Sequence, residues 1–140
     1  LNVTAAAGAA GFAVVEDRIG SRNVVLVSLA ALVGLGALLL LAEGKAAFWA
    51  LALLLGLFIG PAQAASRTLM ARMAPPAELG AQFGLFALSG RITGFVGPFL
   101  LASVTAATAS QHAGMAVVLV FLGLGLAILC FVAEPERVTR

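Results

Sequence analysis

The chain has 140 residues, of which 62% are hydrophobic and 10% are charged, and its net charge at pH 7 is +2. Soluble domains carry roughly 25% charged residues, so a soluble fold of this size could not bury so much apolar surface. The composition therefore excludes a soluble domain and predicts an all-α, multi-pass membrane protein. The eight basic residues stand mostly at the ends of apolar runs rather than in one patch, so no nucleic-acid partner is expected.

The rare residue types limit the chemistry further. Cys130 is the only cysteine and His112 the only histidine, so neither an intramolecular disulfide nor a clustered Cys and His metal site is expected. The sequence has no nucleotide-binding loop, and no cofactor is expected. Residue 1 is Leu, and the apolar start lacks the pattern of a signal peptide. These features predict the C-terminal part of a longer protein.

Five apolar stretches are predicted to cross the membrane: residues 1–15, 24–42, 46–69, 83–109 and 113–133. The first is shorter than the ~20 residues that a spanning helix needs, so it is expected to be the end of a span. Pro61 lies inside the third stretch, and Gly97-Pro98 inside the fourth. Proline in a helix removes a hydrogen bond, which predicts kinks and possible flex points at these two places.

Polar turns separate the stretches at residues 16–23, 43–45, 70–79 and 110–112, and a polar tail follows residue 133. Lys45 is the only basic residue near the second and fourth turns. The positive-inside rule therefore places the first turn, the third turn and the C-terminus in the cytoplasm. The abundance of Arg, Ala and Gly suggests a bacterial protein, so the membrane is expected to be a bacterial inner membrane. Six arginines carry this argument: Arg18, Arg22, Arg67, Arg72, Arg137 and Arg140.

The first turn contains Asp17-Arg18-x-Gly20-x-Arg22. An acid at a helix end can cap backbone N–H groups and pair with an arginine on the adjoining helix, so these residues could form a conformational latch. An ordinary cytoplasmic turn would carry similar charges, and both interpretations remain open.

This turn resembles the repeated loop motif of the major facilitator superfamily, a Gly followed by Asp-Arg-x-Gly-Arg-Arg, with Ala13 replacing the first Gly and Ser21 one basic residue. The stretch GPAQAASRTLMARMAPPAELGAQFGLFALSGRITGFVGP is more specific and resembles the vacuole-effluxer-like, autophagy-related branch of that superfamily. The resemblance implies the last five helices of a twelve-helix fold, with the C-terminus cytoplasmic. The matching positions are Gln63, Ser66, Arg67, Phe83-Gly84, Ser89-Gly90-Arg91 and Gly97-Pro98.

Five polar residues lie close to or inside apolar sequence and are the candidates for a substrate pathway: Gln63, Ser66, Arg67, Ser89 and Arg91. Gln63 and Arg67 are four residues apart and share a helix face. Arg91 lies ~12 Å inside its span if the span begins at Phe83. A cation in hydrocarbon is costly unless it is paired or hydrated, and these spans contain no acid to pair with it.

Arg91 and Gln63 are therefore expected to face the central cavity. There Arg91 would bind an anionic group of the solute, such as a carboxylate, or pair with Glu78 or the absent half of the protein. Arg67 lies near the cytoplasmic end and could instead extend its side chain to the headgroups.

These features favour secondary transport of a small solute by alternating access, with the lipid bilayer and a missing N-terminal half as the other partners. The family resemblance implies amino acids or related metabolites. The alternative is a membrane scaffold or assembly subunit that packs through the glycine pairs Gly56/Gly60, Gly80/Gly84 and Gly90/Gly94. An enzyme is not expected, because the spans hold no Asp, Glu or His and no Ser paired with a base.

Overall fold

The computed structural model describes residues 2–132, and all regular structure in this part of the chain is helical. The elements are α1 (Asn2–Ile19), α2 (Ser21–Leu41), α3 (Lys45–Met73), the 3-10 turn η1 (Pro76–Glu78), α4 (Leu79–Thr108) and α5 (Gln111–Phe131). Four segments of this region are long and apolar enough to cross a membrane, namely α2, α3, η1 with α4, and α5. The predicted all-α class of a polytopic membrane bundle is confirmed.

Three of the four connections between the described helices are shorter than predicted, and the second is shifted by one residue, to 42–44. Within 16–23 only Gly20 lies outside a helix, and the predicted turn over 70–79 shrinks to residues 74–78, most of them in η1. A charged residue can end an apolar run without ending the helix, because Arg and Glu are good helix formers, as is Met. Gly20 breaks the helix since its φ of 89° and ψ of 154° suit glycine almost alone. The predicted end of the last span at residue 133 and the tail with Arg137 and Arg140 lie outside the described residues.

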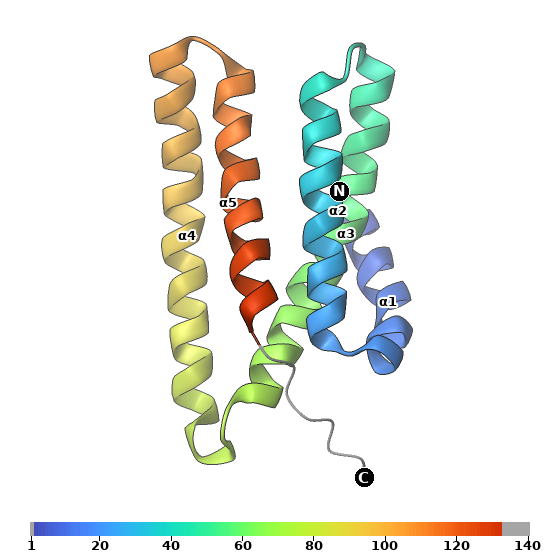
Figure 1. Ribbon diagram of the computed structural model, residues 1–140, viewed down its shortest axis with the longest axis vertical. Coiled ribbons are helices and arrows are strands. Elements are labelled where there is room, and N and C mark those ends of the chain that lie inside the picture. The colour runs from blue at the N-terminus through green and yellow to red at the C-terminus, as the bar shows by residue number, and fades with distance from the viewer. Residues whose placement is uncertain (1, 133–140) are drawn as a thin grey trace.

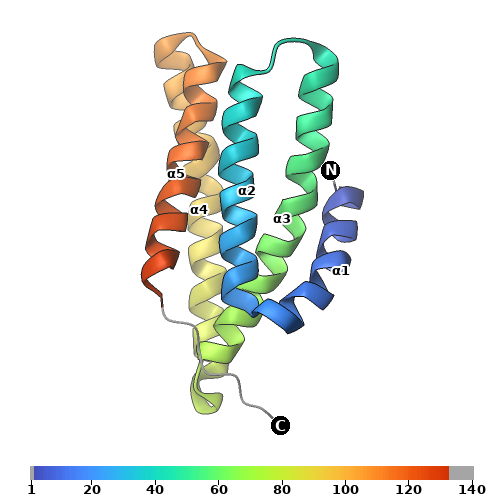
Figure 2. The ribbon, with the colours of Figure 1, turned by 45° about the vertical axis from the view of Figure 1, so that its right-hand side comes forward.

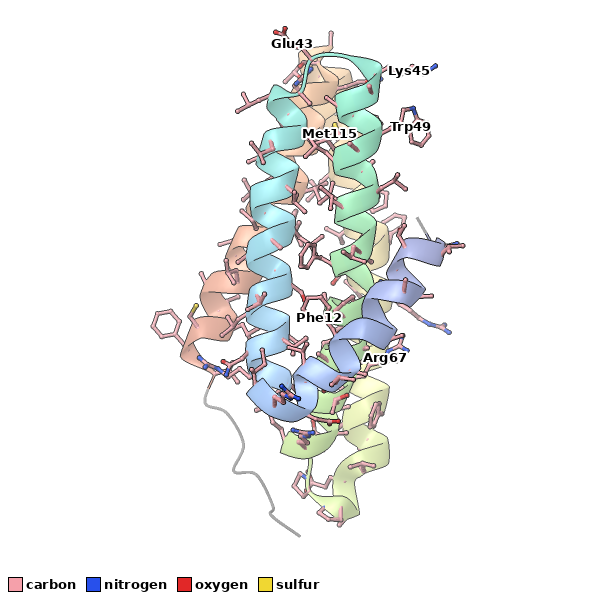
Figure 3. All side chains as sticks on the ribbon, turned by 90° about the vertical axis from the view of Figure 1, so that its right-hand side faces the viewer. Phe12, Glu43, Lys45, Trp49, Arg67 and Met115 are labelled. Atoms are coloured by element: carbon pink, nitrogen blue, oxygen red, sulfur yellow. The ribbon has the colours of Figure 1, made fainter. Side chains whose placement is uncertain are left out.

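The helices run alternately up and down (Figure 1). The connections from α1 to α2 and from α3 to α4 lie at the lower end, whereas those from α2 to α3 and from α4 to α5 lie at the upper end, in both Figure 1 and Figure 2. Glu43 and Lys45 therefore stand at the end opposite to the one that Arg67 approaches (Figure 3). The topology inferred from the positions of the basic residues requires this alternation.

The helices form an open row rather than a closed bundle. α1 packs on α3, α3 on α2, α2 on α5, and α5 on α4, with only slight contact between α3 and α4. α4 stands at one edge of the row and α1 at the other (Figure 1). α4 has no buried residue. Its position relative to the other helices therefore depends mainly on α5.

A small core lies where α2 and α3 meet. Val24 and Ala65 are 1% and 0% exposed, and Val25 completes the cluster. Phe12 and Leu129 pack against it from α1 and α5. Many large apolar side chains point outward instead, as in Phe95 on α4, which is 72% exposed. Helices in a bilayer direct apolar side chains toward lipid or toward other helices. The exposed apolar side chains therefore fit the predicted class of membrane protein.

The closest helix contact joins α1 to α3 through two glycines. A Cβ atom at Gly8 would overlap the backbone carbonyl of Leu57, and one at Gly60 would overlap that of Ala5. The rings of Phe12 and Phe58 meet edge to face beside them, with centroids 5.8 Å apart. Gly60 therefore permits a close helix contact within the chain. A Cβ at any glycine of the predicted pairs on α4 meets nothing within 4 Å, at Gly80, Gly84, Gly90 and Gly94.

The two predicted flex points lie inside continuous helices. α3 runs unbroken through Pro61, which is buried. Figures 1 and 2 both show α3 changing direction near its middle, the part of the helix that contains this proline. α4 also continues through Gly97 and Pro98, and its ribbon is nearly straight in Figure 1. Flexing at these positions remains a prediction.

Candidate functional site

The polar candidates fall into two groups on different helices. Gln63, Ser66 and Arg67 lie on α3, whereas Ser89 and Arg91 lie on α4. Gln63 and Arg67 are both exposed, as their four-residue spacing predicts for one helix face. No hydrogen bond or ion pair within residues 2–132 joins the two groups. Since α2 and α5 stand between α3 and α4 in the row, the chain alone does not bring the groups into one site.

The serine hydroxyls bond to their own helices. Ser66 Oγ donates to the carbonyl of Gln63 at 2.9 Å, and Ser89 Oγ donates to that of Phe86 at 2.8 Å. Local bonds of this kind satisfy a hydroxyl in an apolar environment. They also use the hydrogen that each serine could donate, so toward a solute both hydroxyls are limited to accepting hydrogen bonds.

Arg91 is the deepest cation of the described helices. It lies twelve residues after Leu79, which is about 18 Å along α4 and near the middle of its 30 residues. This distance along the helix exceeds the ~12 Å counted from Phe83, because the helix begins four residues earlier. The side chain is exposed and makes no hydrogen bond or ion pair with any residue from 2 to 132.

Glu78, the one partner for Arg91 that the sequence offered, is too far away. It lies thirteen residues before Arg91, a separation of roughly 20 Å along the helix axis. Insertion of an arginine at the centre of a membrane helix costs about 3 kcal/mol or more when nothing compensates for the charge. A solute, water or another helix must therefore meet this guanidinium.

Arg67 has a shallower position. It lies six residues before the end of α3 at Met73, about 9 Å from that end. An arginine side chain can cover such a distance and place its charge among the headgroups. Both interpretations of Arg67, headgroup contact and substrate pathway, remain compatible with its exposed position (Figure 3).

A mainly apolar cavity of about 450 Å³ lies beside this region, between α4 and α5. Its only polar side chain is Thr93, whose hydroxyl donates to the carbonyl of Ser89 at 2.8 Å. Arg91 does not line this cavity, although its neighbour Ile92 does. An anion would find no partner there, so the cavity is not the site to which Arg91 points. Its walls are Ile92, Thr93, Val96 and Gly97 from α4 and Val117, Val118, Phe121 and Leu122 from α5.

The predicted latch lies in what we call the Gly20 corner, residues 16–22. Asp17 and Arg18 are exposed there, and Glu16, Gly20 and Ser21 form hydrogen bonds in the corner. Ser21 Oγ donates to a carboxylate oxygen of Glu16 at 2.8 Å, and the N–H of Gly20 donates to the carbonyl of Glu16 at 2.9 Å. Sequence reasoning missed Glu16 and Ser21. The sequence feature that could have indicated them is an acidic residue before, and a hydroxyl residue after, a glycine that separates two helical segments.

Comparisons with known proteins agree with this architecture. The model of the family described as vacuole effluxer Atg22 like matches residues 3–138. The chain is also 30% identical over 87 residues to a protein of Bacillus subtilis (strain 168) named "Uncharacterized MFS-type transporter YxiO". That alignment covers 62% of this chain and 20% of the relative. No solved structure matches the chain. The chain is a multi-pass membrane protein that belongs to the vacuole effluxer Atg22-like family.

Proposed function

We propose that the protein is a secondary transporter that moves a small solute across a bacterial inner membrane by alternating access. Membership of a family described as an effluxer and similarity to a protein named as an MFS-type transporter support this proposal. In this proposal the described helices form the last five of twelve, and the solute binds near the midplane between two halves. The solute class is amino acids and related metabolites.

The observation that carries the proposal is the position of Arg91. Its guanidinium lies midway along an apolar helix at the edge of the row, exposed and without a partner in residues 2–132. A solute carboxylate would compensate for the charge, since arginine and carboxylate form two parallel hydrogen bonds. Gln63, on an exposed face of α3, supplies a neutral donor and acceptor for the same solute after the two halves assemble.

The scaffold alternative explains less of the molecule. Gly8 and Gly60 already form an interface within the chain, so these two close-packing glycines need no external partner. The glycines of α4 remain open, and a partner helix could pack on them. A scaffold, however, has no use for an unpaired cation at the middle of that helix, whereas a transporter of anionic solutes does.

Vesicle transport tests the proposal directly. The whole encoded protein is reconstituted in liposomes, and entry of radiolabelled amino acids is measured with and without ion gradients. We expect exchange of at least one carboxylate-bearing amino acid above the rate of protein-free vesicles. Folded, reconstituted protein that moves no amino acid under any gradient would contradict the proposed solute class, and failure with other small carboxylates as well would favour the scaffold.

A further inference from the structure

Arg22 connects two parts of the chain that are distant in sequence. It is the second residue of α2, and its Nη2 donates at 3.0 Å to the carbonyl of Cys130, near the end of α5. These residues are 108 positions apart. The Nε atom of the same guanidinium is buried and has no partner among residues 2–132. The guanidinium is therefore half-buried at the joint between α2 and α5, with its Nε covered and its Nη2 bonded to α5 at the exposed rim.

The end of α5 needs the charge that Arg22 supplies. The last four carbonyls of a helix lack partners within it, and the helix dipole concentrates negative charge there. α5 has no basic residue in its last turn. The N–H of Val132 bonds to the carbonyl of Leu129 at 3.1 Å, and Arg22 takes the next carbonyl. Many helices carry a basic residue in their own last turn. For α5, Arg22 of the neighbouring helix α2 supplies this positive charge.

The Gly20 corner directs Arg22 toward α5. Ser21 is 1% exposed, and its bond to Glu16 fixes the first turn of α2 against the last turn of α1. α2 has no acid in its own first turn, so Glu16 also provides the negative charge that a helix N-terminus favours. With this turn fixed, the side chain one residue later is aimed at the end of α5.

We propose that Arg22 is a positioning residue that fastens the end of α5 to the start of α2 and thereby holds the α4–α5 hairpin against α1–α3. α4 makes most of its contacts in residues 2–132 with α5, so the position of α4 depends mainly on this joint. The fastening itself is independent of transport. Its consequence for Arg91, which α4 carries, rests on the proposed function.

The test measures how firmly the end of α5 is held. In the whole encoded protein, with Cys130 and an Arg72→Cys substitution as the only thiols, nitroxide labels report the distance between the ends of α5 and α3. We expect Arg22→Ala to broaden the distance distribution about twofold, because a helix end that loses its tie opens locally. Arg22→Lys keeps the charge but loses the planar fork, and should give an intermediate width.

Arg67→Ala is the matched control, since it removes an arginine near the same end of the molecule that makes no hydrogen bond or ion pair within residues 2–132. An unchanged distribution in Arg22→Ala, or equal broadening in Arg67→Ala, would overturn the proposal. If Arg22→Ala fails to fold, the Arg22→Lys distribution decides: a width equal to that of the unsubstituted protein contradicts the planar-fork contact. The labels need no solute, so a failure of the transport proposal leaves this result unaffected.

Discussion

Arg91→Ala should reduce solute affinity by about 10- to 100-fold, because a hydrogen bond to a charged group contributes roughly 1.5–3 kcal/mol. The loss should appear mainly as a higher KM for carboxylate-bearing solutes in vesicle uptake. Arg91→Lys keeps the charge but not the two-pronged geometry, so its loss should be smaller. The effect is large because Arg91 is the one cation that the described helices place at mid-depth.

Ile92→Ala provides the comparison at the same depth. Ile92 lines the apolar cavity against α5 and should affect packing without affecting recognition of the solute. Its KM should stay close to that of the unsubstituted protein. Uptake by Arg91→Ala that matches the unsubstituted protein in both KM and maximal rate would show that the arginine has no part in binding.

Gly8→Leu should prevent α1 from docking on α3, with loss of folded protein in detergent. Even Gly8→Ala should cost about 1–3 kcal/mol, the usual range for overpacking, because the new Cβ meets a backbone carbonyl that cannot turn away. The expected readout is a lower thermal midpoint of the purified protein. Gly60→Ala should behave similarly, since its Cβ would meet the carbonyl of Ala5 across the same interface.

Gly11→Ala is the matched control on the same helix. A Cβ there meets nothing within 4 Å, and alanine favours a helix over glycine by roughly 1 kcal/mol. Its thermal midpoint should stay unchanged or rise. Gly8→Ala and Gly60→Ala share one interface, so the double variant should lose less stability than the two single losses together, because the first substitution already separates the helices. Equal midpoints for Gly8→Ala and Gly11→Ala would contradict the close approach.

The helices themselves were predictable from the sequence, because length and apolarity together define a membrane span. Their ends were not, since Glu16 and Arg18 mark the end of an apolar run but are good helix formers that let α1 continue. Only Gly20, through its positive φ, ends α1. The start of α4 also differed, since the helix begins at Leu79 rather than Phe83 and Arg91 therefore lies farther along it than expected.

The individual polar residues of the candidate site were recognisable in the sequence, since arginine and glutamine stand out in apolar sequence. The residues that lie next to them in the folded structure were not predictable from the sequence. The bond from Arg22 to the Cys130 carbonyl depends on the packing of α2 against α5, and a backbone acceptor has no sequence signature. Likewise, Glu16 rather than Asp17 bonds to Ser21, because the last turn of α1 brings the earlier acid toward the corner. Side-chain direction on a helix decided both contacts.

The central claim is that Arg91 faces a water-filled pathway that the solute enters. The most direct measurement is the reaction of an Arg91→Cys variant, without other thiols, with a charged, membrane-impermeant thiol reagent, beside Ile92→Cys at the same depth. We predict that position 91 reacts, that the transported solute slows this reaction, and that position 92 reacts far more slowly. A thiol at position 91 that is inert from both sides of the membrane, or no more reactive than one at position 92, would contradict the claim.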